Sequence, residues 1–174
     1  MVDPKALFSF SYGLYVVGTE FEGKLNAQVA DAVMQLTSSP VCLAACLNKA
    51  NYTAELLAKG GRFSISVLSE DAPMPFIGVF GFRSGRVFDK FANVAPDAWH
   101  KSDGVPVVTA HSVAAVEAEV VKVEDVETHM LFIGRVTSAS VLSEARPLTY
   151  ADYHKVKKGK SPANAPSVIF NSVS

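Results

Sequence analysis

Residues 36–53 read LTSSPVCLAACLNKANYT and join two polar clusters through one apolar run. The first polar cluster lies at residues 37–39, the apolar run is Val41–Leu47, and the second cluster occupies residues 48–53. A continuous apolar run of this length predicts a buried β-strand. Its seven residues would separate the two clusters by roughly 20–23 Å. The pair of clusters therefore suits an elongated ligand, with a ring system near one end and an anionic tail near the other.

The second cluster has the composition of a helix start. Asn51 is a suitable N-cap for a helix over YTAELLAKGG, which the glycine pair at residues 60–61 would end. A helix N-terminus offers free N–H groups and a positive dipole end to a phosphate. Lys49 adds a charge and Thr53 adds a hydroxyl. On the residues alone, an ordinary capped helix is an equal alternative, and a simple polar turn before Pro40 is slightly favoured for the first cluster.

Length and composition favour one domain over residues 1–174. The chain is 49% hydrophobic with a formal net charge of −1, which gives no reason to expect nucleic acid or an anionic membrane as a partner. No apolar run approaches the roughly 20 residues of a membrane span. Because residues 1–5 lack the charged-then-apolar order of a signal peptide, we expect a cytoplasmic protein.

The chain contains two cysteines, Cys42 and Cys46. On a strand they would face the same side about 13 Å apart, which is too far for a disulfide. No His/Cys spacing resembles a metal site, so no metal is expected.

The remaining patterns predict a mainly β protein with a few short helices. Strands are expected over residues 12–21, 24–36, 41–47 and 62–69 and near Val105, followed by a long hairpin whose second arm covers residues 129–142. Short helices are expected after Asn51 and over residues 73–82, an irregular segment over 93–104, and a partly extended tail over 146–174 that ends in the apolar triplet 168–170. Six or seven strands that do not alternate with helices favour a small β-barrel over a doubly wound sheet. A break in the alternation at Val120–Val121 predicts a β-bulge.

Further candidates lie outside the opening stretch. Arg83, Arg86 and Lys90 could balance a phosphate dianion, although a solvated basic loop is the commoner fate of such residues. His129 stands between an acidic hairpin turn and the apolar MLFIG, where its ring could face a pocket mouth. Cys46 is by default a small core residue. No Ser/His/Asp pattern or carboxylate pair indicates hydrolysis.

Several segments together resemble a known family. They are YGLYVV, QVADAVMQLTSSPV, CLNKANYT, FSISVLSEDAPMPFIGVFGFRSGRVFDKF, THMLFIGRV and PLTYADYHKVKKGKSP. In this order they resemble the flavin reductase-like proteins with the FMN-binding split barrel, and most of all the ferric reductase, flavoredoxin and NAD(P)H:flavin oxidoreductase branch. The resemblance covers about Ser11–Pro162. It implies a six-stranded Greek-key split β-barrel that forms a homodimer, with one FMN per subunit near the interface.

The resemblance also implies site residues. The flavin-contacting positions fall on Gln28, Val29, Ala30, Asp31, Thr37, Ser38, Ser39, Asn48, Lys49 and Thr53, and a basic position falls on Lys90. The histidine near the flavin ring falls on His129, and a cysteine near the flavin falls on Cys46. Many relatives have Gly-Asp-His where this chain has Glu127-Thr128-His129, so the carboxylate that could orient the histidine is missing.

We therefore expect an FMN-dependent NAD(P)H oxidoreductase that passes electrons to free flavin, a ferric chelate or a small redox protein. His129 is expected to position the nicotinamide or the acceptor. Two alternatives stand beside this one: a flavoredoxin-like electron carrier with little NAD(P)H turnover, and a flavin-binding barrel without a redox role. The choice between NADH and NADPH stays open.

Overall fold

The computed structural model describes residues 3–167, and the apolar triplet 168–170 lies outside this range. The strands are β1 (Tyr15–Phe21), β2 (Lys24–Ala30), β3 (Val33–Ser38), β4 (Val41–Asn48), β5 (Arg62–Leu68), β6 (Trp99–Ser102), β7 (Val105–Val108), β8 (Ser112–Val126) and β9 (His129–Val141). The helices are α1 (Pro4–Leu7), α2 (Tyr52–Gly60), α3 (Met74–Gly81) and α4 (Tyr150–Lys155), with short 3-10 turns η1 (Phe91–Asn93) and η2 (Pro96–Ala98).

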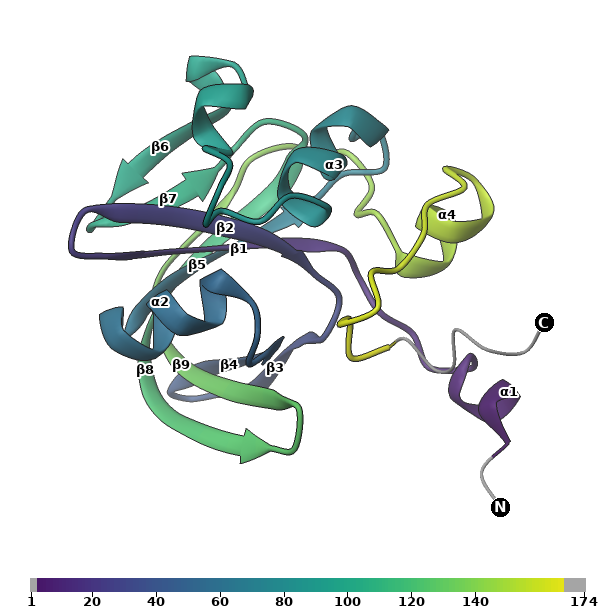
Figure 1. The fold of residues 1–174 in the computed structure, drawn as a ribbon, viewed down its shortest axis with the longest axis horizontal. Helices are drawn as coiled ribbons and strands as arrows, with labels where there is room; N and C mark the ends of the chain where they lie inside the picture. Colours follow the sequence, from purple (N-terminus) through teal and green to yellow (C-terminus); the bar gives the residue numbers. More distant parts are fainter. Residues whose placement is uncertain (1–2, 168–174) are drawn as a thin grey trace.

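The strands form a curved antiparallel sheet whose two end strands do not pair with each other (Figure 1). Seven strands pair in the order β2-β1-β5-β8-β9-β4-β3, and β6 pairs with β7 as a separate ribbon. The two end strands, β2 and β3, are joined directly through Asp31 and Ala32. At this joint the N–H of Val33 donates to the carbonyl of Asp31 at 3.0 Å, a tight three-residue turn. The barrel is therefore split between β2 and the β3–β4 pair.

Two apolar clusters lie on opposite faces of the β1–β2–β5 part of the sheet. On β1, neighbouring residues Val16 and Val17 belong to different clusters, because successive side chains of a strand point to opposite faces. The cluster around Val17 fills the barrel interior, with Phe63, Phe132 and residues of α2. The cluster around Val16 packs α3 and α4 on the outside. These two helices and α2 thus flank the split.

Most of the predicted elements are confirmed. The run Val41–Leu47 lies in β4, where Ala44, Ala45 and Leu47 are buried and Val41 is exposed; the helix after Asn51 is α2, and residues 74–81 form α3. The bulge is also confirmed, because the β8–β9 register shifts between Val120 and Lys122. Both cysteines are free, as expected.

Two expectations were wrong in detail. Residues 24–36 form two strands because the tight turn at Asp31 reverses the chain. Residues 93–104 are more ordered than expected, since η2 is held by the N–H groups of Thr109 and Ala110, which both donate to the carbonyl of Ala98. The main sheet has seven strands, within the six or seven expected from the sequence.

Candidate functional site

A cavity of about 380 Å³ lies at the split of the barrel. One side is formed by β2, by the end of β4 and by the first turn of α2. The other sides come from the end of α3 and the loop after it, from α4, and from the segment that follows α4. A cavity of this size is typical of a small-molecule or cofactor site.

One end of the cavity is built around a buried lysine. Lys90 is only 4% exposed. Its Nζ donates to the carbonyl of Ala27 at 2.7 Å and to the carbonyl of Phe80 at 3.0 Å. Burial lowers the pKa of Lys90 to about 8. Within residues 3–167 no carboxylate pairs with this ammonium. A buried cation without a counter-ion, facing a cavity, favours the binding of an anion.

The N-terminus of α2 lies at the same end. Asn51, Tyr52 and Thr53 line the cavity, and Asn26 Nδ2 donates to Thr53 Oγ1 at 2.9 Å. Asn26 is the neighbour of Ala27, so β2 joins the helix start to the lysine. Gly85, in the loop after α3, packs closely against the side chain of Asn26. A Cβ at residue 85 would lie 2.1 Å from Asn26 Oδ1. The helix dipole and Lys90 thus act together on one anion site.

The other end of the cavity carries the amide of Gln28, the carboxylate of Asp31 and the thiol of Cys46. The side-chain oxygen of Gln28 is buried and accepts no hydrogen bond within the described part of the chain. A buried acceptor left without a donor is costly, so a ligand N–H or O–H would stabilise it. Burial and then the charge of Asp31 raise the pKa of the Cys46 thiol. The thiol form therefore dominates near neutral pH, which suits a neighbour of a ring system better than a nucleophile.

Nine of the proposed site residues line this cavity: Gln28, Val29, Ala30, Asp31, Cys46, Asn48, Thr53, Arg83 and Lys90. The structure brings them together because β2 and the end of β4 face each other across the split.

Thr37, Ser38 and Ser39 do not line the cavity. They belong to the β3–β4 hairpin, where the Thr37 hydroxyl donates to the carbonyl of Pro40 at 2.6 Å. Because β3 runs antiparallel to β4, with Val33 opposite Ala45, the hairpin turn lies at the far end of β4. The first polar cluster therefore lies away from the cavity, whereas Asn48, Asn51 and Thr53 of the second cluster line it.

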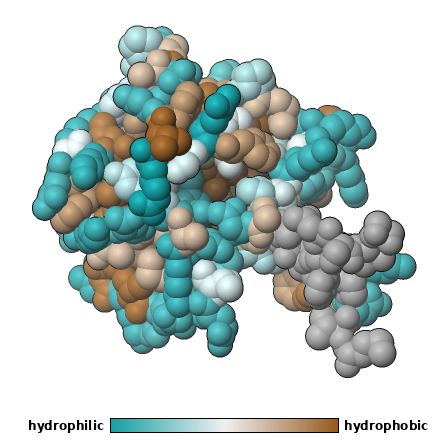
Figure 2. All heavy atoms as spheres, in the orientation of Figure 1, coloured by the Kyte–Doolittle hydropathy of each residue, from teal (hydrophilic) through white to brown (hydrophobic). Residues whose placement is uncertain are grey.

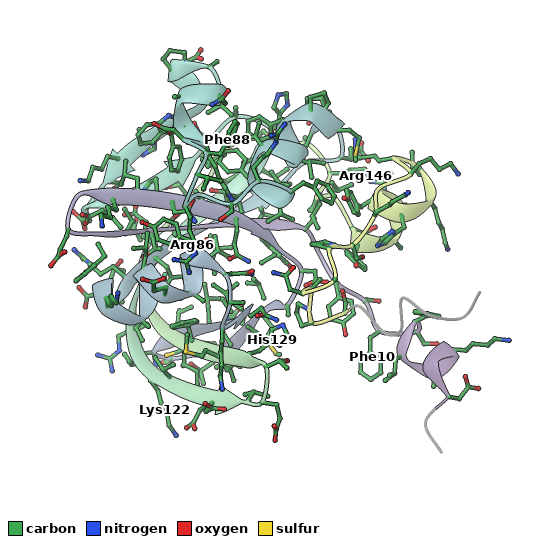
Figure 3. All side chains as sticks on the ribbon, viewed as in Figure 1. Phe10, Arg86, Phe88, Lys122, His129 and Arg146 are labelled. Atoms are coloured by element: carbon green, nitrogen blue, oxygen red, sulfur yellow. The ribbon has the colours of Figure 1, made fainter. Side chains whose placement is uncertain are left out.

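Two of the proposed cations are also directed elsewhere. Lys49 pairs with Asp125 at 2.6 Å on the surface. Arg86 lies over α2, where it pairs with Glu55 at 2.7 Å and covers the ring of Tyr52 at 4.9 Å (Figure 3). Of the basic residues after α3, Arg83 and Lys90 line the cavity.

His129 lies beside the site without lining the cavity. It is the first residue of β9 and pairs with Asn48, which does line the cavity. Its Nδ1 is 2.8 Å from the hydroxyl of Thr128. Its Nε2 is buried and has no partner among residues 3–167. The threonine thus occupies the place of the missing carboxylate, and the other ring nitrogen is available.

Sequence reasoning missed Asn26 and the whole contribution of the C-terminal part of the chain. An asparagine inside a strand pattern was a usable signal, since a buried amide needs partners. Tyr150, Tyr153, residues 160–162 and residues 164–166 line the cavity. The aromatic-rich TYADYH was visible, but no local pattern shows that its tyrosines reach the cavity.

The described residues hold no group of three or more His, Cys, Asp or Glu side chains placed for a metal ion. Across residues 3–167, none of the helices is long and apolar enough to span a membrane.

Comparison with known proteins gives one family. Residues 7–159 match the model of the flavin reductase-like domain. The chain is 49% identical over 171 residues to a ferric-chelate reductase (NAD(P)H) of Archaeoglobus fulgidus, covering 98% of this chain and 99% of that protein. It is 43% identical over 166 residues to a high molecular weight rubredoxin of Moorella thermoacetica, covering 95% of this chain and 72% of that protein.

Solved structures agree with this assignment. The styrene monooxygenase flavin reductase of Pseudomonas putida superposes with a TM-score of 0.69 at 28% identity, over 83% of this chain and 88% of that chain. An FMN-binding protein of Thermus thermophilus superposes with a TM-score of 0.65 at 28% identity, over 76% of this chain and 73% of that chain.

Proposed function

Since this chain belongs to the flavin reductase-like family, we propose that it is an FMN-dependent NAD(P)H oxidoreductase, with residues 1–174 as one FMN-binding domain. Its acceptor is a ferric chelate, free flavin or a small redox protein. The observation that carries the proposal is Lys90, a buried ammonium without a carboxylate partner in the described chain, beside the N-terminus of α2.

The residues that are present fit FMN. The phosphate would take the anion site of Lys90, Thr53 and the first turn of α2. From Asn26 on β2 to Asp31 just after it, the chain spans about 17 Å, which suits the long axis of such a ligand. The unpaired oxygen of Gln28 would accept a hydrogen bond from a ring N–H, and Cys46 and Asn48 would lie beside the ring.

When bound, FMN would supply the redox chemistry, the transfer of two electrons from the nicotinamide to the acceptor. The chain's own residues would bind the cofactor, orient it and shield it from water. Lys90 and the α2 dipole hold the anionic tail, the walls from β2 and β4 exclude water, and polar groups of β2 fix the ring edge.

The proposal is tested by loading the protein with FMN and following oxidation of NADH and of NADPH with a ferric chelate as acceptor, without oxygen. We expect FMN uptake near one per chain and turnover with at least one nicotinamide. Uptake without turnover would favour the alternative, an electron carrier. The similarity to the high molecular weight rubredoxin of Moorella thermoacetica supports that alternative. A protein that takes up no FMN would contradict both.

We expect His129→Ala to raise the KM for NAD(P)H several-fold and to change kcat less. His129 pairs in the sheet with Asn48, which lines the cavity, and its Nε2 has no partner among the described residues, so it would position the nicotinamide or the acceptor. Steady-state kinetics on FMN-loaded protein measure both parameters. If both stayed at the wild-type values, the positioning role would be wrong.

We also propose a homodimer. β3 ends the sheet, and its residues after Val33 are exposed. Met34, at 61% exposure, and the exposed Leu36, Val121 and Val123 leave apolar surface on the β3–β4 and β8–β9 hairpins, where apolar side chains gather in the lower left of Figure 2. An exposed edge strand with apolar side chains is a site for association.

On this basis, Met34→Lys should weaken the dimer, because it places a charge in an apolar interface. Light scattering coupled to size exclusion would show a shift toward the monomer over a dilution series. Lys101→Met on β6 is the control, because it replaces an exposed charged residue by an apolar one. It should leave the molar mass measured by light scattering unchanged. A wild-type protein that is monomeric at all concentrations would contradict the proposal.

The free cysteines are also consistent with a proposed cytoplasmic location.

A further inference from the structure

One wall of the cavity does not come from the barrel. Residues 160–167, here called the strap, follow α4 and have no regular secondary structure. Lys160, Ser161, Pro162, Asn164, Ala165 and Pro166 line the cavity. In Figure 1 the strap leaves α4 and runs back to the bend between β2 and β3. It closes the side of the site that β2, β4 and α2 leave open.

The start of the strap is held by a histidine on α4. Nδ1 of His154 is 2.8 Å from the carbonyl of Gly159. A carbonyl only accepts, so Nδ1 carries the proton and Nε2 is an acceptor. Nε2 lies 3.1 Å from the hydroxyl of Ser161, which also contacts the hydroxyl of Tyr150. His154 and Tyr150 are thus positioning residues for the strap.

The rest of the strap is held by two side-chain contacts to the cavity walls. Asn164 Nδ2 donates to Oδ1 of Asn51, the N-cap of α2. The Ser167 hydroxyl donates to Oδ2 of Asp31. Both partners line the cavity.

The strap makes no backbone pairing with the barrel. Among the described residues, its backbone–backbone hydrogen bond is an internal one, from the N–H of Ala165 to the carbonyl of Pro162 at 3.0 Å. A segment held by a few side-chain hydrogen bonds opens locally at much lower cost than a paired strand. The strap can therefore leave the cavity while the barrel stays folded.

We propose that the strap is a removable cover that sets how fast FMN leaves the site. Closed, it retains the flavin as a bound cofactor; opened, it lets the flavin exchange as a substrate does. This inference rests on the proposed function, and it names the residues that decide between these two modes: Ser161, Asn164 and Ser167.

The test is the triple variant Ser161→Ala/Asn164→Ala/Ser167→Ala in the full chain. The dissociation rate is measured from the rise of free-flavin fluorescence after dilution of FMN-loaded protein, and the association rate from its quenching on mixing. Because each hydrogen bond changes an equilibrium by a factor of about 2 to 10, we expect dissociation to be at least about tenfold faster. The association rate should rise as well, because FMN enters through the same opening that it leaves by.

Ala163→Ser is the matched control, since Ala163 is an exposed strap residue that does not line the cavity. It should release FMN at the wild-type rate. An unchanged dissociation rate in the triple variant would overturn the proposal, and so would slower association alone, because the strap would then be part of the preformed binding surface. If the unsubstituted chain binds no FMN, the proposed function itself fails, which is a different result from wild-type binding with an inert strap.

Discussion

Lys90→Met should weaken FMN binding by about 30- to 1000-fold, which corresponds to about 2–4 kcal/mol for a desolvated charge contact. The ammonium is buried, donates to two carbonyls and has no carboxylate partner in residues 3–167, so the phosphate would be its only counter-ion there. Methionine keeps the length and the apolar stem of the side chain. Titration of flavin fluorescence measures the affinity.

Riboflavin, which lacks the phosphate, is the matched ligand for this variant. Its affinity should be nearly equal for wild type and Lys90→Met. Lys101→Met, an exposed lysine on β6, should bind FMN as the wild type does. If Lys90→Met lost riboflavin and FMN affinity equally, the lysine would be holding the fold of the cavity and not the phosphate.

The same lysine gives a pH dependence with a defined sign. Burial lowers the pKa of Lys90 to about 8 in the protein without ligand, and a phosphate beside it would raise that pKa. Binding therefore takes up a proton, so FMN affinity should be greatest below pH 8 and fall as the pH rises through this value. Riboflavin affinity should stay level over the same range. A flat FMN profile would contradict the assignment.

Gly134→Ala should lower the free energy of unfolding by about 2–3 kcal/mol, the usual cost of overpacking a core. Gly134 lies on β9 between Leu43 of β4 and Val120 of β8. A Cβ there would lie 2.5 Å from Cε1 of Phe63 and 2.9 Å from Cβ of Ala118. Phe63 is fully buried and cannot move aside.

Calorimetry or thermal denaturation measures this effect, with an expected fall in Tm of about 4–12 °C for a chain of this size. Gly78→Ala is the matched control. Gly78 is inside α3, and a Cβ there meets nothing within 4 Å. The control should be about 0.5–1 kcal/mol more stable than wild type, because alanine favours the helix. Equal Tm values for the two variants would contradict the packing described around Phe63.

The parts of the fold that could be predicted are those that depend on residues adjacent in the sequence. The apolar run at residues 41–47 predicts β4 because a buried strand needs no other signal than length and hydrophobicity. Asn51 and the glycine pair at residues 60–61 mark α2 because caps act on adjacent residues. The turn at Asp31 was missed, since it interrupts a run that looks continuous in composition.

The site was predictable to the extent that it lies on such elements. Thr53 and Asn48 follow from the end of β4, and Gln28–Asp31 came from the family resemblance. Thr37–Ser39 was also proposed, although a polar turn was slightly favoured there, because a polar cluster at a strand end does not show which end faces the split. The burial of Lys90 and the contacts of residues 160–167 depend on interactions between residues far apart in the chain. No local sequence pattern predicts such interactions.

The central claim is that this cavity holds an FMN that NAD(P)H reduces. It is tested most directly by rapid anaerobic mixing of the FMN-loaded protein with NADH and, separately, with NADPH, while the visible absorbance of the bound flavin is recorded. We predict rapid bleaching in a single turnover with at least one of the two. Bound flavin that keeps its oxidised spectrum with both nicotinamides would contradict the claim.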